Sequence, residues 1–522
     1  VTFLGFKTVE LEVIIRKDRI TTQTFYLEEE SQMLQDVVIN VERQEMKTRV
    51  LTSVVSLSPR KIAEFWVGGD PDLVRAIQVL PGVVTSGDQG GQVYIRGGAP
   101  IQNLVLLDGM IVYNPFHSIG FFSIFDTDIL QSADVYTAGF NAQYGSRNSS
   151  VMDVRTRDGN RQRFAGKFYA STYMAKLLLE APLGKKRENG FSPASFLVSA
   201  KTSYLDKTSQ VLYPYVESNF GEGLPFTFND IYGKISTQSE NGSKIGVYGF
   251  YFDDGVNISP IQAISWDSYG VGVDFKVIPP SSSTIIEGAF ASSSYYIQST
   301  ELPDQPRNSR IGGFNGGLNF TYLLRDNDEI KYGLQAIGYS TDYTFTNSIG
   351  LQFTEAQNTT ELGAYFKYRY VGKRLLIEPG LRVQYYGSLA ELSFEPRIGV
   401  KYNVTDNFRL KASGGLYSQN LVAANSDRDV VNLFYGFLSG PDNIPSTFKG
   451  QEIDSKLQSA KHAVFGFEYS LGSNFDLNVE SYVKDFSQLT NVNRNKIYPD
   501  IPQYASQPEL LRKNFIIEKG LA

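Results

Sequence analysis

Hydrophobic and polar positions alternate along the chain from about residue 160 to its end. In segment 475–484 the apolar side chains fall on one face and the polar side chains on the other, as read in FDLNVESYVK. Segments 408–413 (FRLKAS) and 462–470 (HAVFGFEYS) repeat this period of two. A period of two is typical of β-strands with one apolar face. Roughly sixteen such strands follow Asn160, each near the ~10 residues that a tilted membrane strand needs.

The connections between these strands differ in length. Short turns at 240–242, 371–373, 405–407 and 471–473 alternate with long polar connections such as 206–229 and 419–461. Short turns at one end and long loops at the other are typical of an outer-membrane barrel. An array of soluble β-sandwich domains also shows a period of two, but its connections would not sort in this way. We therefore predict an all-β dominated fold in which residues 161–522 form a transmembrane antiparallel β-barrel.

The stretch from Gln89 to Gly159 has a different pattern. Its short apolar runs are cut by glycines and an Asn-Pro pair, which favours a compact mixed sheet with tight turns. Asp108-Gly109 between two apolar runs predicts a two-residue hairpin. A helix is expected from Gly69 to Leu80, with Asp70 as its N-cap and Pro71 at its first position. We predict a mixed α/β domain over residues 45–160, which would fill the lumen of the barrel.

Apolar and polar residues alternate in places within residues 1–35, and we interpret this segment as the C-terminal part of a small β-sandwich. The apolar run DVVINV follows at 36–41, within a segment that we delimit as 36–44. Two interpretations remain open at this point. The run is either the last strand of the sandwich with a linker, or an extended segment offered to the sheet edge of a partner.

Composition and charge limit the classes of function that the protein can have. The 522 residues carry a formal net charge of -6, and this absence of a basic field weighs against nucleic acid as a partner. The absence of cysteine excludes disulfides, thiolate metal sites and cysteine nucleophiles. No run reaches the roughly 18 apolar residues of a membrane helix, so a helical membrane protein is excluded. We expect any signal peptide to have been removed or to lie outside this sequence.

Few side chains could support catalysis or metal binding. The two histidines, His117 and His462, lie far apart in the sequence, and His462 falls on the polar row of its strand, which should face the lumen. Asp126 and Asp128 resemble a fragment of a calcium loop whose glycine and closing glutamate are missing. The turn at 96–98 is not followed by the Gly-Lys-Ser/Thr of a phosphate loop. We therefore predict no catalytic residue, no metal, no cofactor and no enzyme activity.

Three short motifs carry a resemblance to a known family. They are the IRGG turn, the LLDG hairpin and the Tyr-Gly turn, with Arg96, Gly97, Gly98, Asp108, Gly109, Tyr144 and Gly145. In this combination the segment resembles the plug domain of TonB-dependent outer-membrane receptors. Residues 1–35 are similar to the carboxypeptidase-regulatory-like domain that many of these receptors carry, and residues 161–522 resemble their barrel. The resemblance implies twenty-two strands, so we expect several C-terminal strands to lie beyond this sequence.

The resemblance also implies a function and a location. It implies an active importer in the outer membrane of a Gram-negative bacterium, with the N-terminal domain in the periplasm. The TonB complex of the inner membrane would capture a short box by strand addition. That box would consist of Asp36, Val37, Val38, Ile39, Asn40 and Val41. Further expected partners are outer-membrane lipids and either a surface lipoprotein or other outer-membrane proteins.

Substrate would bind above the plug. The plug loops expected to face it contain Gln102, Asn103, Tyr113, Asn114, Phe116 and His117. Aromatic faces and side-chain amides together suit a polar ligand with some apolar surface. The alternative for each residue is a turn position that packs within the plug. An oligosaccharide, a peptide or a metal chelate would fit this description.

One position departs from the family pattern. Many members have Arg-Gly-Pro before the Tyr-Gly turn, whereas this chain has Ala138-Gly139-Phe140, so no plug arginine is expected to lock the plug at this point. Arg96 remains, and a buried guanidinium needs a carboxylate, which we expect on an inward row of the barrel. An alternative function is a structural or accessory subunit of a larger outer-membrane assembly that transports nothing. A passive porin is disfavoured because the plug would obstruct flow.

Overall fold

The structure is a computed structural model of the chain. It describes residues 53–67, 70–85, 92–187, 190–213, 223–258, 262–280, 282–301, 305–324, 328–347, 349–424, 434–440, 444–448, 450–471, 475–493, 498–499, 501–507 and 515–522, together with isolated positions at 1, 9–11, 13, 23–25, 27 and 50. The predicted sandwich at 1–35 lies almost wholly outside the described residues, and the box at 36–41 and its segment 36–44 lie wholly outside them. These assignments stay predictions.

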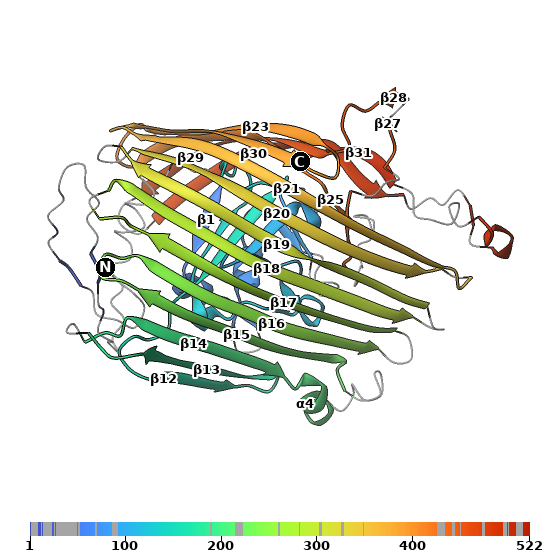
Figure 1. Ribbon diagram of the computed structural model, residues 1–522, viewed down its shortest axis with the longest axis horizontal. Helices are drawn as coiled ribbons and strands as arrows, with labels where there is room; N and C mark the ends of the chain where they lie inside the picture. Colours follow the sequence, from blue (N-terminus) through green and yellow to red (C-terminus); the bar gives the residue numbers. More distant parts are fainter. Residues whose placement is uncertain are drawn as a thin grey trace.

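A single antiparallel sheet of 16 strands curves around the rest of the molecule (Figure 1). Each strand pairs with the next strand of the sheet along the chain, and β12 and β31 form the two edges. The strands are β12 (Ala165–Ala170), β13 (Met174–Leu183), β14 (Ala194–Ser203), β15 (Phe226–Gln238), β16 (Lys244–Ile258), β17 (Gln262–Val277), β18 (Thr284–Glu301), β19 (Gln305–Leu323), β20 (Glu329–Thr346), β21 (Gln352–Val371), β22 (Leu375–Tyr386), β23 (Glu391–Asn403), β24 (Phe408–Gln419), β29 (Gln458–Leu471), β30 (Phe475–Val492) and β31 (Phe515–Leu521). The all-β barrel and its strands after Asn160 are thus confirmed.

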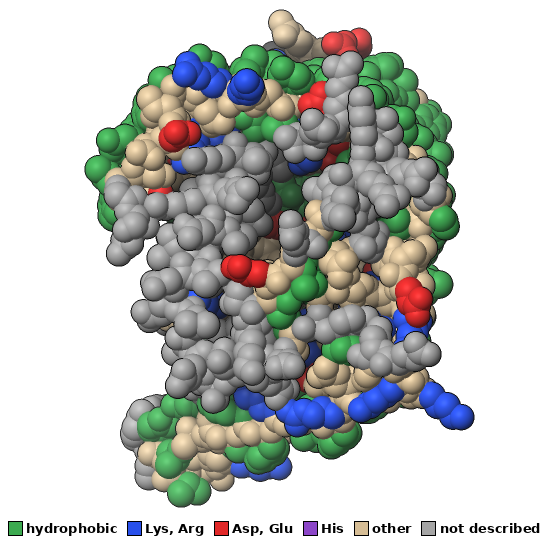
Figure 2. Space-filling model, turned by 90° about the vertical axis from the view of Figure 1, so that its left-hand side faces the viewer, with side chains coloured by type: hydrophobic (Ala, Val, Ile, Leu, Met, Phe, Trp, Pro, Cys, Tyr) green, Lys and Arg blue, Asp and Glu red, His purple; other side chains and the backbone are tan. Residues whose placement is uncertain are grey.

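The alternating pattern sorts side chains between the outer surface and the lumen. On β30, Val483 is 52% exposed while its neighbour Lys484 is fully buried against the plug. On β29, Phe465 is exposed and His462 is buried, so His462 does face the lumen as predicted. Figure 2 views the end where the short turns lie and shows hydrophobic side chains along the outer margin. An apolar outer surface and a polar lumen are what a membrane barrel requires.

The predicted division into short turns and long loops is only partly correct. Long connections do occur at the end opposite the short turns, including the one that holds helix α4 (Leu205–Leu212) and the one from β24 to β29. At the same end, however, β16 stops at Ile258 and β17 begins at Gln262, and β22 and β23 are joined through 387–390. Here the strands themselves are long, so strand length rather than loop length extends the wall.

The plug lies inside the curved sheet, as the blue and cyan elements of Figure 1 show. Its core is a mixed five-stranded sheet in the order β1-β10-β11-β6-β7, in which β11 and β6 are parallel. These strands are β1 (Val54–Leu57), β10 (Leu130–Tyr136), β11 (Ser150–Thr156), β6 (Asn103–Leu107) and β7 (Met110–Ile111). Around them lie α2 (Pro59–Ile62), β2 (Trp66–Val67), β3 (Asp70–Pro71), α3 (Leu73–Gln78), β4 (Val83–Thr85), β5 (Val93–Ile95), η1 (Pro100–Gln102), β8 (Phe116–His117), η2 (Ser118–Gly120), β9 (Phe122–Ser123) and η3 (Thr127–Ile129). The predicted compact mixed sheet is confirmed.

The predicted hairpin in the plug is confirmed, whereas the predicted start of its helix is wrong. The hairpin at Asp108-Gly109 is confirmed, because β6 and β7 pair across it and both turn residues have positive φ, +50° and +88°. The predicted helix start is wrong by two residues. Asp72, not Asp70, is the N-cap of α3, and its carboxylate accepts a hydrogen bond from the Arg75 amide at 3.0 Å. Asp70 and Pro71 instead form β3, which pairs with β2.

Short elements complete the connections at the far end of the barrel. They are β25 (Leu421–Ala423), β26 (Phe437–Ser439), β27 (Thr447–Phe448), β28 (Gln451–Glu452) and η4 (Pro502–Tyr504). The hairpin of β25 and β26 folds inward, and Phe437 packs edge-on against Tyr113 of the plug at 5.5 Å between ring centroids. Among the described residues, no helix has the length and apolar character to span a membrane.

Candidate functional site at the plug–barrel interface

Glu480 on β30 joins the barrel wall to the plug next to its first strand. Its carboxylate accepts hydrogen bonds from the Ser53 amide at 3.1 Å, the Ser53 hydroxyl at 2.8 Å and the Arg96 guanidinium at 2.6 Å. Arg96 also donates to the Ser53 hydroxyl at 2.7 Å and lies 4.7 Å from the ring centre of Tyr482. Lys411 adds a second cation at 2.5 Å. We call Ser53, Arg96, Lys411 and Glu480 the tether anchor, because Ser53 directly precedes β1.

The IRGG turn has the shape that this contact requires. Arg96 and Gly97 both have positive φ, +48° and +77°, so the chain reverses sharply and aims the guanidinium at the wall. A Cβ on Gly98 would lie 1.9 Å from the Ser149 hydroxyl oxygen, so only glycine fits there. Lys484 of the barrel holds the same turn by donating to the Ile95 carbonyl at 3.1 Å and the Ser149 carbonyl at 3.0 Å. The carboxylate expected for Arg96 on an inward row is therefore Glu480.

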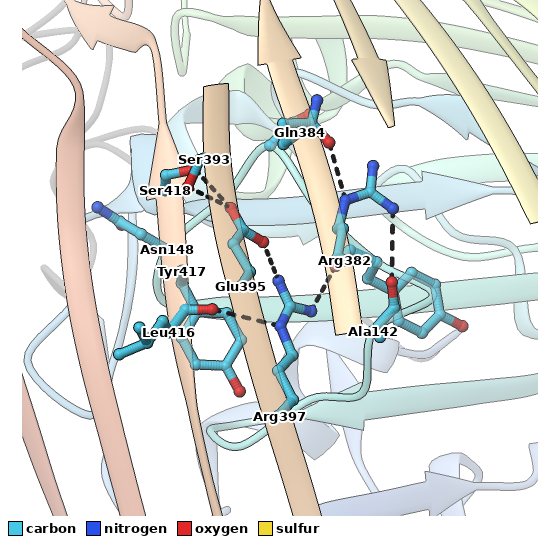
Figure 3. Close-up of polar contacts among 12 residues, drawn as sticks. Ala142, Asn148, Arg382, Gln384, Ser393, Glu395, Arg397, Leu416, Tyr417 and Ser418 are labelled. Carbon is cyan, nitrogen blue, oxygen red and sulfur yellow. Dashed lines mark hydrogen bonds and ion pairs between the residues drawn. The ribbon is translucent and has the colours of Figure 1, made fainter. Parts of the chain in front are cut away.

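A second contact, the arginine cradle, consists of Arg382, Glu395 and Arg397 and holds the plug loop 141–145 (Figure 3). Arg397 donates to the carbonyl oxygens of Asn141 and Tyr144, both at 2.6 Å, and pairs with Glu395 at 2.5 Å. Arg382 donates to the Gln143 carbonyl at 3.3 Å and to Gln384 and Gln335 of the barrel at 2.8 and 2.6 Å. In the arginine cradle, the two cations therefore come from the barrel and bind backbone carbonyl oxygens of the plug.

The Tyr144-Gly145 turn and Phe140 fit the cradle closely. A Cβ on Gly145 would lie 2.1 Å from Arg382 Nε, and a Cβ on Gly363 would lie 2.2 Å from its terminal nitrogen, so the guanidinium is held between two glycines. Tyr144 donates to Asp153 at 2.9 Å within the plug. Phe140 is fully buried, 4.9 Å from the Arg397 guanidinium and 4.3 Å from Tyr417. An aromatic ring, two residues after the position where the family pattern has a plug arginine, thus packs against a barrel arginine.

His117 lies at a third contact and is not presented to the space above the plug. Its ring is fully buried, with Nδ1 2.6 Å from Asp254 and Nε2 2.7 Å from Asp230, and it stacks on Phe228 at 4.4 Å. Burial alone would lower the pKa of His117, but the carboxylates of Asp230 and Asp254 outweigh burial and raise it to about 9. The charged ring therefore binds plug to wall, with Lys201 also paired to Asp230 at 3.1 Å.

The two aspartates that resembled a calcium loop bind a lysine instead. Lys176 of β13 lies 2.8 Å from Asp70, 3.0 Å from Asp126 and 2.8 Å from Asp128. Its ammonium group supplies the positive charge that these three plug carboxylates need. In the described part of the chain, no group of three His, Asp or Glu side chains is arranged to hold a metal ion.

Asp108 of the LLDG hairpin also contacts the wall. Its carboxylate accepts from the Thr156 amide at 2.9 Å, the Thr156 hydroxyl at 2.6 Å and the Tyr232 hydroxyl at 2.6 Å, with Lys234 at 3.7 Å. Burial acts to raise the pKa of Asp108, but Lys234 and these hydrogen bonds hold it below its ordinary value. Barrel lysines therefore face plug carboxylates here and at Lys176, whereas barrel carboxylates face plug cations at Arg96 and His117.

Four of the six residues predicted to face substrate converge on one chamber. Asn103, Tyr113, Asn114 and Phe116 line a space that is partly open to solvent, together with Trp266 of β17, Tyr435, and Phe437 of β26. The other two residues are used within the protein. Gln102 accepts from the Ala99 amide at 2.8 Å, and His117 binds the barrel carboxylates. Asn103 also bonds to Val93 and Ser150, so part of its capacity is structural.

Sequence reasoning predicted a barrel carboxylate for Arg96 but did not identify which barrel residues make these contacts. The signal for the inward rows was present, since polar residues alternate with apolar ones on β22, β23 and β30. Periodicity does not reveal which inward residue meets which plug residue. Periodicity also gave no sign of Trp266, Tyr435 and Phe437, because each lies more than 100 residues along the chain from the plug loops.

Comparisons with known proteins agree with this architecture. Residues 47–151 match the family described as TonB-dependent Receptor Plug Domain. This match lies within the predicted plug and covers its IRGG, LLDG and Tyr-Gly motifs. Residues 47–151 therefore match a plug domain, and in the structure this segment lies inside a β-barrel.

Solved structures share the fold at low sequence identity. The siderophore receptor PirA from Pseudomonas aeruginosa aligns over 90% of this chain and 80% of its own, with a TM-score of 0.62 and 14% identity. PirA from Acinetobacter baumannii aligns over 91% and 75%, with 0.61 and 12%. The outer membrane transporter YddB from Escherichia coli aligns over 90% and 72%, with 0.60 and 11%. No curated protein matches this chain in sequence. None of these comparisons bears on the carboxypeptidase-regulatory-like assignment at 1–35, which stays a prediction.

Proposed function

We propose that this protein is a TonB-dependent importer that carries a nutrient across the outer membrane. One observation carries the proposal: the residue that precedes the first plug strand is bound to the barrel wall by Glu480, which also binds Arg96. A pull on the chain before Ser53 would reach this anchor before it reached the rest of the plug. The fold and the plug domain support the same function.

The proposed mechanism assigns a part to each region. The TonB complex would bind Asp36 to Val41 from the periplasm by strand addition, and the pull would act on β1, an edge strand whose one partner among the described strands is β10. An edge strand of four residues has few ladder hydrogen bonds, so it is the part of the plug sheet that force detaches most easily. The cargo would be an oligosaccharide, a peptide or a metal chelate.

The experiment removes Asp36 to Val41 and measures cellular uptake of a panel of labelled oligosaccharides, peptides and ferric chelates. We expect uptake of the transported member to fall to background, because energy coupling is lost, while the barrel remains folded in the membrane. A matched control deletes 42–47 and should retain TonB binding in a pull-down with the purified TonB C-terminal domain. Undiminished uptake without Asp36 to Val41 would contradict the proposal. Stable co-purification with other outer-membrane proteins, with no uptake by either form, would favour the structural subunit.

A further inference from the structure

The chamber lined by Asn103, Tyr113, Asn114 and Phe116 has walls that are mainly apolar and aromatic. Trp266 and Phe437 are 3% and 2% exposed, and Phe437 packs edge-on against both Tyr113 and Tyr435. Among the described residues that line it, the only charged side chain is Arg147 of the plug. A ligand that fills this space must therefore be largely apolar and must tolerate one positive charge.

Arg147 differs from most buried cations of this protein. Lys176, Lys201, Arg96 and Arg397 each have a carboxylate within 3.1 Å. Arg147 is 3% exposed and donates from one terminal nitrogen to the Ser146 carbonyl at 2.7 Å and to the Tyr339 hydroxyl at 3.3 Å. Its Nε has no hydrogen-bond partner among the described residues. The buried carboxylate of Glu361 on β21 acts on the guanidinium electrostatically, but no direct hydrogen bond joins the two groups. A buried guanidinium whose Nε has no acceptor is costly, which points to an acceptor from outside the protein.

A second buried donor at the chamber is also unpaired. The indole N–H of Trp266 has no hydrogen-bond partner in the described structure, although the side chain is almost fully buried. Buried Trp N–H groups usually have an acceptor, because an unmade hydrogen bond at a buried donor costs about 1–3 kcal/mol. The chamber thus offers a cation and a neutral donor in apolar surroundings, and no carboxylate among its described lining residues.

We propose that the chamber binds a ligand with an apolar or aromatic body and a single carboxylate, which pairs with Arg147. This inference rests on the proposed import function and names the class of its cargo. The apolar body would lie against Trp266, Tyr435 and Phe437, and the Trp266 N–H would donate to a second acceptor on the ligand. A chelate with several negative charges fits less well, because one arginine would leave the other charges desolvated and unpaired.

The chain contains two tryptophans, Trp66 and Trp266, and Trp66 is 60% exposed. In the full chain with Trp66→Phe, tryptophan fluorescence therefore reports on the chamber alone. The probes are 3-phenylpropanoate and its neutral amide, 3-phenylpropanamide, titrated into this purified protein. We expect a saturable change with the carboxylate and binding at least about tenfold weaker with the amide, the factor that a charge-assisted hydrogen bond supplies.

Arg147→Gln in the same background should abolish the preference for the carboxylate. Arg310→Gln, which removes an exposed arginine on β19, should leave it unchanged and serves as the matched control. Equal binding of the two probes by the folded parent, or no saturable change with either, would overturn the proposal without any need for the Arg147 variant. Binding by purified protein does not involve TonB, so the uptake experiment can fail while this one succeeds, and the reverse.

Discussion

At single positions, glycines decide how closely the plug approaches the barrel wall. Gly145 and Gly363 lie on either side of the Arg382 guanidinium, one from the plug and one from β21, and neither leaves space for a methyl group. The Tyr-Gly turn of the plug is thus explained by a barrel side chain. Because the guanidinium also bonds to Gln335, Gln384 and the 141–145 loop, it has no free direction in which to move.

We predict that Gly145→Ala lowers the free energy of unfolding by about 1–3 kcal/mol, the usual cost of overpacking a filled interior. Thermal unfolding of the purified protein in detergent measures it. Gly233→Ala is the matched control, because a Cβ there meets nothing within 4 Å. Equal melting temperatures for the two variants would mean that Arg382 moves aside at no cost, which would contradict the close fit at Gly145.

At the scale of elements, β1 is the first strand of the plug sheet along the chain, and so the one that follows the predicted box most closely in sequence. It is short, lies at the edge of the sheet and pairs with β10 in the register Val54↔Tyr136 to Leu57↔Ala133. Glu480 secures its start through Ser53, whose φ is +59°. A strand with one neighbour and one side-chain anchor can be released in one step, whereas β10 and β11 each have two neighbours.

Glu480→Gln is predicted to loosen this strand selectively. The change leaves the buried cation Arg96 without its carboxylate and Lys411 with Glu468 alone at 3.4 Å, and breaking a buried pair such as Arg96–Glu480 costs about 3 kcal/mol or more. Backbone amides of Val54 to Leu57 should then exchange with deuterium on the order of 100-fold faster, while those of β11 change little.

The control for this measurement is Glu287→Gln. Glu287 is partly exposed, and its oxygens lie 3.8–3.9 Å from Lys331 and Lys276, so its pairs contribute little. Exchange at β1 should not respond to it. If Glu480→Gln also left β1 exchange unchanged, Glu480 would not anchor the strand.

At the scale of the whole molecule, alternate residues of each barrel strand face outward, and these outward residues make the outer surface apolar. Val271 and Val277 both lie on the outer face of β17, 56% and 39% exposed, but Val277 ends the strand at the short-turn side. Six residues of tilted strand separate a position near the bilayer centre from one near the interface.

We predict that Val271→Arg destabilises the folded barrel in lipid vesicles by about 2–4 kcal/mol and Val277→Arg by about 0–1 kcal/mol. The cost depends on depth because only the bilayer centre denies the guanidinium water. Urea unfolding in vesicles measures both. Equal costs for the two variants would mean that β17 does not cross a bilayer in the assumed position.

The sequence predicted the fold more completely than it predicted the contacts of the candidate site. Strand periodicity, the Asp108-Gly109 turn and the inward position of His462 are local or repeating features, and the structure has all of them. The start of α3 was misplaced because Asp70 and Asp72 are both good N-caps, and Asp70 is taken by Lys176 of the barrel. His117 was expected to face substrate, since nothing near it in the chain predicts Asp230 and Asp254.

The sequence by itself determined that this chain forms a barrel of alternating strands around a mixed plug, because hydrophobic periodicity and turn chemistry act between neighbouring residues. Only the tertiary structure decided which groups hold the two together and which line the chamber. Arg96 and Glu480 lie 384 residues apart, and Arg397 and Asn141 lie 256 apart. Such pairs form because the curvature of the sheet brings the inward rows of side chains against the plug. In this buried, low-dielectric interface an unpaired charge or polar group is costly, so complementary charges and hydrogen-bonding groups face each other.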